Sequence, residues 1–262
     1  MLITLWAKVL EQARSIPLLI DTDAPRIAER LDYDFGRLKG MGRMSLAGCC
    51  GRASIFDDDV RVFLGAHPDA VVMNVGAGLD ARYERLGRPA LTAWFDMDLP
   101  DVMALRRQLL PPSGVQQYLD DSLLEDGWIE TLVRFDKPIL LVFEGVLMYF
   151  EEAEVQSLMA RLQQRLPGVH IIFDLLPLMF QKRSRRHDAL RHLGTQPPEF
   201  KWAMGNPQDM ETWQKGLKVL KVQQLHERCA SRYPWFARLL YLTRWAQDNM
   251  DQRVVQISLD AG

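Results

Sequence analysis

The chain has 262 residues, of which 48% are hydrophobic and 25% are charged, and its formal net charge is −2. A chain of this length buries enough apolar surface to fold without disulfide staples, and we expect one α/β domain. The near-zero net charge excludes a general nucleic-acid binder, because such proteins need a basic face to neutralise phosphates.

Cysteine usage and hydropathy both indicate a cytoplasmic protein. The three cysteines are Cys49, Cys50 and Cys229, and the adjacent pair has neither a metal-binding spacing nor the pattern of a disulfide framework. Charged side chains interrupt the apolar stretches at residues 1–19 and 235–246, so neither provides the roughly 18 to 20 apolar residues of a membrane span. We therefore expect buried thiols, a cytoplasmic location and no membrane association.

In chain order, residues 1–66 are mostly helix-patterned, with a turn-rich interruption expected over residues 39–54. From residue 70 onward, short apolar runs alternate with amphipathic segments, and helices are expected over residues 102–110 and 151–166. This alternation predicts right-handed βαβ crossovers and a mostly parallel sheet with both faces covered. The predicted strands cover residues 71–75, 92–98, 116–122, 138–150, 168–174, 217–225 and 253–259.

Residues 175–250 are rich in aromatic side chains and carry four of the seven tryptophans, Trp202, Trp213, Trp235 and Trp245. The last two predicted strands cover residues 217–225 and 253–259, and we expect the residues between them to form a helical insert that covers the strand ends. An aromatic cap suggests an apolar or planar substrate. Packing of the cap onto the sheet explains the same aromatic residues equally well.

The first predicted strand runs into Gly76-Ala77-Gly78, and Asp80 opens the next helical segment. A glycine loop between a strand and a helix lets a ligand approach the backbone, and this loop also matches the dinucleotide-binding pattern. Asp96 follows twenty residues after Gly76, where an acid would bind ribose hydroxyls. NAD and S-adenosylmethionine both have such hydroxyls, so the loop alone leaves both cofactors open.

Acidic side chains at the predicted strand ends favour one of the two cofactors over the other. The diphosphate of NAD would be repelled by Asp80 and Glu144, since like charges ~4 Å apart repel by about 1 kcal/mol even in water. S-adenosylmethionine carries a cationic sulfonium and ammonium and no phosphate, so it is the predicted cofactor. The acids at these ends, where open α/β sheets bind ligands, are Asp80, Asp96, Asp98, Asp120, Asp121 and Glu144.

Each of these acids also has a purely structural interpretation. Asp80 could complement the N-terminal dipole of the following helix, and Asp120, Asp121 and Ser122 could form an N-cap cluster. Glu144 is harder to explain in this way, because it lies inside a long apolar run where an unpaired acid would be poorly solvated. A cationic ligand would provide its partner.

Taken together, five segments of the chain resemble the leucine carboxyl methyltransferase-like family of S-adenosylmethionine-dependent O-methyltransferases, most closely its bacterial polyketide (tetracenomycin-type) branch. The resemblance implies a class I methyltransferase (Rossmann-like) fold with a seven-stranded, mostly parallel sheet and one reversed strand near the C-terminus. It further implies a single methyltransferase domain over residues 1–262, with an N-terminal helical segment (1–66), a cofactor-binding core (67–174), and a cap insert with closing strands (175–262). The matching segments are residues 51–64, 67–86, 94–111, 143–150 and 200–213.

The resemblance also implies roles for individual residues in binding S-adenosylmethionine. Arg52 would hold the methionine carboxylate of the cofactor, and Glu144 would lie by the same amino-acid end. Tyr149 would lie near the transferred methyl group, as the one expected catalytic residue. The remaining cofactor-binding residues would be Gly76 and Gly78 at the backbone, Asp80, Asp96 at the ribose, and Asp120, Asp121 and Ser122 at the adenine.

Two departures from the family pattern concern these roles. Ala81 stands where a threonine is usual, and Asp120-Asp121-Ser122 replaces a commoner Asp-Leu-Arg run. The roles of Asp80 and Arg82 therefore stay open between cofactor contact and scaffold.

The acceptor is expected to be a small molecule, a carboxylate or hydroxyl of a polyketide-like or aromatic metabolite. A carboxylate is already ionised at neutral pH, whereas a phenol with a pKa near ~10 must lose a proton. No evident base stands out in the sequence, and this favours a carboxylate acceptor. His187 and His192 are five residues apart, a poor spacing for a helical metal site, and no metal is expected.

Other functions remain open at this stage. The chain could be an NAD-dependent oxidoreductase, a catalytically silent cofactor-binding protein, or a methyltransferase for a protein C-terminus. The basic run at Lys182, Arg183, Arg185 and Arg186 could steer an acyl-carrier partner or be a solvated helix face. Self-association into a homo-oligomer is equally possible.

Overall fold

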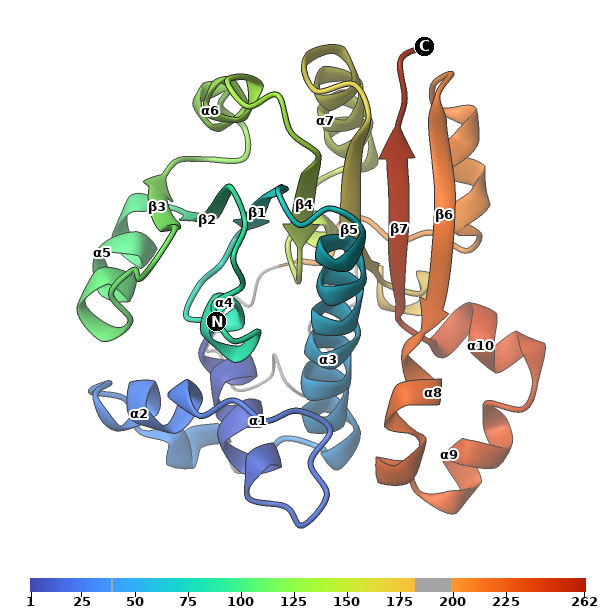
Figure 1. The fold of residues 1–262 in the computed structure, drawn as a ribbon. Helices are drawn as coiled ribbons and strands as arrows, with labels where there is room; N and C mark the ends of the chain where they lie inside the picture. The colour runs from blue at the N-terminus through green and yellow to red at the C-terminus, as the bar shows by residue number, and fades with distance from the viewer. Residues whose placement is uncertain (39, 182–198) are drawn as a thin grey trace.

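A computed structural model describes residues 1–38, 40–181 and 199–262. A seven-stranded sheet has the order β3-β2-β1-β4-β5-β7-β6, and only β7 runs antiparallel to its neighbours, so the predicted class I methyltransferase architecture is confirmed (Figure 1). The strands are β1 (Val71–Val75), β2 (Ala93–Asp98), β3 (Gln116–Asp120), β4 (Ile139–Phe143), β5 (Val169–Leu175), β6 (Leu217–Gln224) and β7 (Arg253–Leu259).

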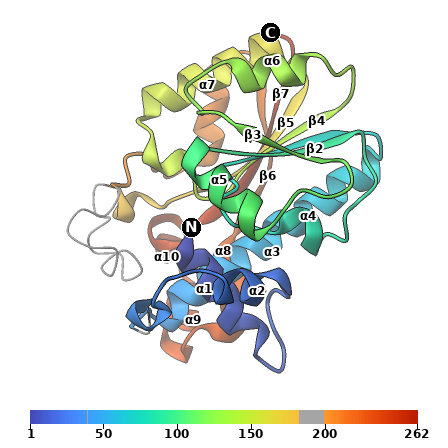
Figure 2. The same ribbon diagram turned by 90° about the vertical axis from the view of Figure 1, so that its left-hand side faces the viewer.

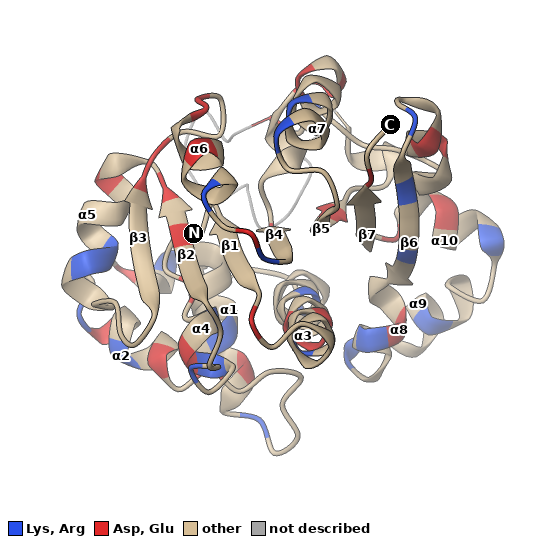
Figure 3. Cartoon of the chain, turned by 45° about the horizontal axis from the view of Figure 1, so that its top comes forward, with Lys and Arg blue, Asp and Glu red and all other residues tan. Residues whose placement is uncertain are grey.

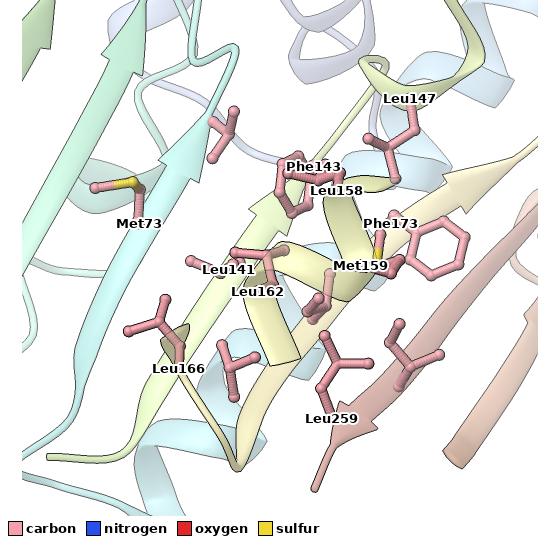
Figure 4. Close-up of a cluster of buried hydrophobic side chains, with 14 of the residues drawn as sticks. Met73, Leu141, Phe143, Leu147, Leu158, Met159, Leu162, Leu166, Phe173 and Leu259 are labelled. Carbon is pink, nitrogen blue, oxygen red and sulfur yellow. The ribbon is translucent and has the colours of Figure 1, made fainter. Parts of the chain in front are cut away.

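The central strands are apolar throughout because helices cover both faces of the sheet. In β1, Val71 and Met73 pack with α6 (Gly127–Val133) and α7 (Glu152–Arg165), whereas Val72 belongs to the cluster that includes α3 (Arg43–Ala66) on the other face. Leu158, Met159 and Leu162 of α7 lie against β1, β4 and β5 (Figure 4). The spacing of these residues places them on one face of the helix. The crossover α5 (Pro100–Leu109) connects β2 to β3.

The predicted strand over residues 138–150 is too long, since β4 ends at Phe143. Gly145 has a positive φ of 71°, and its N–H donates to Asp174 Oδ1 at 2.6 Å instead of to a neighbouring strand. The chain turns there, and Leu147–Tyr149 forms the short 3-10 helix η2. Glu144 therefore lies in the loop beyond the strand end rather than inside the sheet.

The turn-rich interruption predicted over residues 39–54 is wrong, because helix α3 runs unbroken from Arg43 to Ala66. Its glycines permit close packing rather than a turn. A Cβ at Gly51 would lie 2.2 Å from Cys229 Sγ, on the helix α8 (Leu225–Cys229) that packs against α3. Arg52 is consequently a helical residue, held in a rigid element next to a tight helix contact.

A Gly51→Ala substitution is expected to lower the free energy of unfolding by about 1–3 kcal/mol, since the added methyl group has no room beside Cys229. Gly65→Ala is the matched control in the same helix, because nothing lies within 4 Å of its Cβ position. The control should be neutral or stabilising by up to about 1 kcal/mol, as alanine is the better helix former. Urea unfolding of both variants measures the difference, and equal stabilities would contradict the close-packing interpretation.

Helices gather at the carboxyl end of the parallel strands. Figures 1 and 2 place α1 (Leu2–Gln12), α2 (Asp23–Glu29) and the insert α8–α10 at the same end of the sheet. The insert connects β6 to β7, and Arg253 at the start of β7 pairs with Leu175 at the end of β5, which fixes the insert at that edge. Its helices after α8 are η6 (Ala230–Arg232), α9 (Trp235–Leu240) and α10 (Arg244–Met250).

The remaining described helices are short: η1 (Phe35–Leu38), α4 (Arg82–Arg85), η3 (Leu178–Phe180) and η5 (Pro207–Thr212). On the side drawn in Figure 3, basic and acidic segments are interspersed over the helices rather than segregated by sign. Among the described residues, no helix is long and apolar enough to cross a membrane.

Candidate active site

A cavity of about 800 Å³ lies at the carboxyl ends of β1, β2 and β4, within the size range of small-molecule sites. The helical segments α1 and α3, the segments after β4 and β5, and residues of the insert before β7 also contribute to its wall. The structure brings eight of the predicted site residues to this wall: Arg52, Gly76, Gly78, Asp80, Asp121, Ser122, Glu144 and Tyr149. It leaves two of them, Asp96 and Asp120, off the wall.

The glycine loop lies between β1 and α4, where the sequence predicts it. Gly76 and Gly78 have φ values of 65° and 52°, which residues with a Cβ rarely adopt. At Gly76 a Cβ would also lie 2.5 Å from Val146 Cγ2, so the loop passes directly against the segment after β4. Arg106 fixes the loop from behind, donating to the carbonyl oxygens of Gly78 at 3.0 Å and Asp80 at 2.8 Å.

Asp96, which the sequence analysis expected at a ribose, does not line the cavity. Its carboxylate is fully buried and accepts hydrogen bonds from Asn74 Nδ2 at 2.9 Å, Arg106 Nη2 at 2.9 Å and Gln116 Nε2 at 2.6 Å. These donors come from β1, α5 and β3, so Asp96 ties the sheet and its crossover helix together behind the site. It is a scaffold residue.

Asp98, two residues further along β2, lines the cavity instead. Side chains two residues apart in a strand point to the same face, but Asp98 is the last residue of β2 and lines the cavity. Its Oδ2 accepts the Gly78 N–H at 2.8 Å and its Oδ1 accepts the Leu99 N–H at 2.8 Å. Because each oxygen accepts one backbone hydrogen bond, the carboxylate has a fixed orientation beside the glycine loop. It is well placed to accept further hydrogen bonds from a diol.

A similar correction applies at the next strand end. Asp120 forms a bidentate pair with Arg107 on the surface, at 2.9 and 2.5 Å, and does not line the cavity. Asp121 and Ser122, one and two residues later, do line it. Asp121 accepts the Ser122 N–H at 2.8 Å, which holds this turn at the cavity wall.

The acids at the glycine loop and after β4 do not form an unpaired negative wall. Glu144 lies between Arg52 and Arg82, and Asp80 is surrounded by Lys8, Arg82 and Arg85. Burial raises the pKa of Asp80, but the three cations together hold that pKa well below its ordinary value. The sequence argument that Asp80 and Glu144 repel a diphosphate is therefore weakened, because basic side chains neutralise both carboxylates.

Arg52 is held between two carboxylates at the cavity wall. Its Nε donates to Glu144 Oε1 at 3.1 Å and its Nη1 donates to Asp174 Oδ2 at 2.9 Å. The remaining nitrogen, Nη2, lies beside Gly145, 3.3 Å from the position of a Cβ there. With two nitrogens fixed in this way, the guanidinium plane is oriented and Nη2 can bind an anion.

Asp174, which holds Arg52 at the cavity wall, was not singled out from the sequence, and Asp98 was named only as a strand-end acid without a role in cofactor binding. Asp174 ends the apolar run of β5, the same signal by which the other strand-end acids were chosen. Besides Arg52, it accepts the Gly145 N–H and, at 2.6 Å, Gln252 Nε2. Burial raises the pKa of this carboxyl above its ordinary value although Arg52 lowers it.

Sequence comparisons relate this chain to a known family. The family model described as leucine carboxyl methyltransferase matches residues 5–163. The tetracenomycin polyketide synthesis O-methyltransferase TcmP of Streptomyces glaucescens is 34% identical over 83% of this chain and 79% of its own. The S-adenosyl-L-methionine-dependent methyltransferase dpfgK of Gibberella zeae is 30% identical over 92% of this chain and 87% of its own. The chain belongs to the leucine carboxyl methyltransferase family.

Family membership confirms the predicted family and enzyme class, an S-adenosylmethionine-dependent methyltransferase. A putative methyltransferase from Thermobifida fusca, covering 97% of this chain and 94% of its own, superposes with a TM-score of 0.58 at 16% identity. At that identity the likeness concerns the fold alone. The cavity of this family member lies where open α/β sheets bind their ligands, at the carboxyl ends of the strands.

The residues of the cavity fit S-adenosylmethionine in their chemistry. Asp98 offers oxygens to ribose hydroxyls, Nη2 of Arg52 offers a cation to a carboxylate, and the glycine loop offers close backbone approach. Tyr149, half-buried in η2, lines the same cavity with its ring 5.7 Å from that of Phe200.

The histidines and basic residues singled out between residues 182 and 192 lie outside the described residues. The structure instead shows a pair that the sequence analysis did not identify. His226 Nδ1 lies 2.8 Å from Asp251 Oδ2, and Asp251 lines the cavity. Burial raises the pKa of Asp251 to about 6, although His226 lowers it. The two residues are 25 positions apart and meet because the insert returns to the sheet between them.

Proposed function

We propose that this methyltransferase transfers the methyl group of S-adenosylmethionine to a carboxylate oxygen of a planar, apolar small molecule and so forms a methyl ester. The observation that carries the proposal is the arrangement of Asp98, the glycine loop and Arg52 Nη2 around one cavity whose other wall is largely apolar. Tyr149, Phe180 and Phe200 form part of that apolar wall. Such a wall suits a flat ring system better than a polar peptide chain.

In this proposal the bound cofactor supplies an electrophilic methyl group on a cationic sulfur. Asp98 holds the ribose hydroxyls, and Asp121 with Ser122 faces the adenine. Arg52 binds the carboxylate of the amino-acid end through Nη2, while Glu144 and Asp174 fix the guanidinium. Asp80 holds neighbouring side chains of the protein and does not contact the cofactor, since three basic side chains already surround it.

The protein's contribution to the reaction is positioning and exclusion of water. The acceptor oxygen donates an electron pair to the methyl carbon as the carbon–sulfur bond breaks, and the sulfur keeps the electrons of that bond. Tyr149 in η2 places a phenol at the wall where the methyl group would lie. Burial raises the pKa of Tyr149, so its hydroxyl stays neutral and can donate a hydrogen bond.

A hydroxyl acceptor is a second candidate, favoured by the pair of Asp251 and His226. A phenol must lose its proton before or during the transfer, and a carboxylate held by a histidine is a suitable proton acceptor. The two candidates predict different preferences among acceptors of the same shape.

Methyl transfer from radiolabelled S-adenosylmethionine to 2-naphthoate and to 2-naphthol tests the proposal. We expect labelled methyl ester from the naphthoate, and activity lower by about tenfold or more in Tyr149→Phe while S-adenosylhomocysteine still binds. Label only in the naphthol would support the second candidate. A protein that binds S-adenosylhomocysteine but transfers no methyl group to either class of acceptor would contradict the proposed function.

A further inference from the structure

Helix α9, at the outer end of the insert in Figures 1 and 2, presents an apolar face to water. Ala237 and Tyr241, four residues apart, are buried and hold this segment against the rest of the protein. On the other side of the helix, Trp235, Phe236 and Leu239 are 72%, 60% and 56% exposed. A surface helix ordinarily presents polar side chains to water, and a helix that is apolar all round is ordinarily buried. The composition of α9 is therefore that of a covered helix.

A groove of about 590 Å³ lies beside this face and continues the apolar surface. Its wall includes Trp235 and Leu239 of α9, together with Leu242, which is 77% exposed. The buried Tyr233 and Tyr241 also line the groove, with their ring centroids 5.6 Å apart. Exposed apolar residues that gather around a concave site are typical of an interaction surface, unlike single scattered ones. We call the exposed face of α9 together with this groove the α9 surface.

Two opposite charges line the groove and have no partner within the described chain. Glu227 and Arg238 are both exposed, and neither forms an ion pair with a described residue. A two-fold symmetric interface uses the same surface on both copies, so each contact between two different residues occurs twice. A groove with one acid and one base is therefore complementary in charge to a second copy of itself.

The exposed apolar area is also of the size that a stable dimer needs. Trp235, Phe236, Leu239 and Leu242 each expose more than half of their surface. Since a buried aromatic side chain covers about 150–250 Å², the α9 surface with its charged pair offers on the order of 700 Å² per copy. A standard protein–protein interface buries about 800 Å² per partner.

A membrane and the edge of the sheet explain the α9 surface less well. An anionic membrane attracts apolar and basic side chains, but this groove is concave and Glu227 on its wall would be repelled. The edge strand β6 offers another route to self-association. It carries the exposed Lys218 and Lys221 and a register shift between Val219 and Lys221, features that protect an edge from pairing.

We propose that the α9 surface binds a second copy of this chain in a two-fold symmetric dimer. The apolar side chains of α9 in the two copies pack against each other, and Glu227 of each copy pairs with Arg238 of the other. Tyr233 and Tyr241 also line the cavity at the strand ends, so the interface would support one wall of that cavity. The proposal does not depend on which cofactor or acceptor the cavity binds.

Gel filtration with light scattering over a dilution series measures the molar mass and the dissociation constant of the dimer. We expect the wild type to have twice the 30.2 kDa mass of one chain. Leu239→Glu should raise the dissociation constant by at least about 100-fold, because symmetry places the unpaired charge in the apolar contact twice. Leu220→Glu is the matched control, since Leu220 is 49% exposed on β6 and does not line the groove, and it should dimerise as the wild type does.

Reversal of the charges tests the pairing itself. Glu227→Arg and Arg238→Glu should each raise the dissociation constant by about tenfold or more, because like charges then meet at two symmetric positions. An equimolar mixture of the two variants should form a heterodimer with nearly wild-type affinity, since both of its contacts again join an acid and a base. Nonspecific apolar association would not produce this recovery.

A wild type that stays monomeric throughout the dilution series would overturn the proposal, and so would Leu239→Glu that dimerises normally. Loss of the dimer in Leu220→Glu alone would place the interface at the sheet edge instead. A mixture of the charge variants that dimerises no better than either variant alone would contradict the two-fold pairing. Cosedimentation of a monomeric wild type with phosphatidylglycerol vesicles would assign the α9 surface to a membrane.

Discussion

Replacing Asp96 by alanine is expected to lower the free energy of unfolding by about 3–5 kcal/mol, because a buried guanidinium would lose its partner. Arg106 and Asp96 are both fully buried and lie 2.9 Å apart. Burial lowers the pKa of Arg106, and Asp96 more than compensates, so the arginine stays charged in the folded protein. Without Asp96 that charge remains buried, and the amides of Asn74 and Gln116 also lose an acceptor. Urea unfolding measures the loss.

Asp98→Ala is the matched variant, since it removes the same group two residues away in the same strand. We expect at most about 1–2 kcal/mol of destabilisation, since two backbone hydrogen bonds at the cavity edge are lost. Affinity for S-adenosylhomocysteine should fall by about 100-fold, as expected for two hydrogen bonds to a charged group. Asp96→Ala with near-normal stability and Asp98→Ala with unchanged affinity would show that the two roles have been assigned the wrong way round.

The contrast between these two acids shows what the sequence could determine. Strand β2 was predicted from its apolar run, and both acids were identified as strand-end residues. The spacing from Gly76 favoured Asp96, but the point where the strand leaves the sheet decides which carboxylate reaches a ligand. That point depends on pairing with β1 and β3, whose residues Asn74 and Gln116 donate hydrogen bonds to Asp96. No local pattern in the sequence predicts these hydrogen bonds, because the three residues come from three different strands.

The charge argument at the glycine loop had a similar limit. Asp80 and Glu144 both line the cavity, but Glu144 pairs with Arg52 and Arg82, which lie 92 and 62 positions away in the sequence, and Lys8 reaches Asp80 from 72 positions away. A count of acids therefore overestimated the negative charge of the site. Family resemblance over several segments predicted the cofactor better than electrostatics did, because it drew on the whole arrangement and not on unpaired residues.

Glycine was also ambiguous when considered alone. At Gly76 the positive φ agrees with the predicted loop, whereas Gly51 lies within a continuous helix and is needed for contact with Cys229. Only the partner element distinguishes a glycine that bends the chain from one that makes room for a neighbour. The same reasoning applies to Arg52, whose function depends on the helix that this close contact holds in place.

Arg52→Gln is expected to weaken binding of S-adenosylhomocysteine by about 10- to 100-fold, because the ligand's carboxylate loses a charge-assisted hydrogen bond to Nη2. Binding of methylthioadenosine, which lacks the amino-acid part, should change little. The comparison of the two ligands by calorimetry separates loss of a direct contact from general disturbance of the cavity. Arg52→Lys retains the positive charge without the planar fork, so its affinity for S-adenosylhomocysteine should lie between those of the wild type and Arg52→Gln.

The two-ligand comparison matters because Arg52 also neutralises Asp174. Removing the guanidinium leaves that buried carboxylate with the Gly145 N–H and Gln252, and since burial already raises its pKa, it can take up a proton instead. A rearrangement of this kind would distort the loop after β4 and affect any ligand that approaches the glycine loop. Equal losses for both ligands would therefore assign Arg52 to the scaffold with Asp96, whereas a selective loss for S-adenosylhomocysteine would assign it to the cofactor with Asp98.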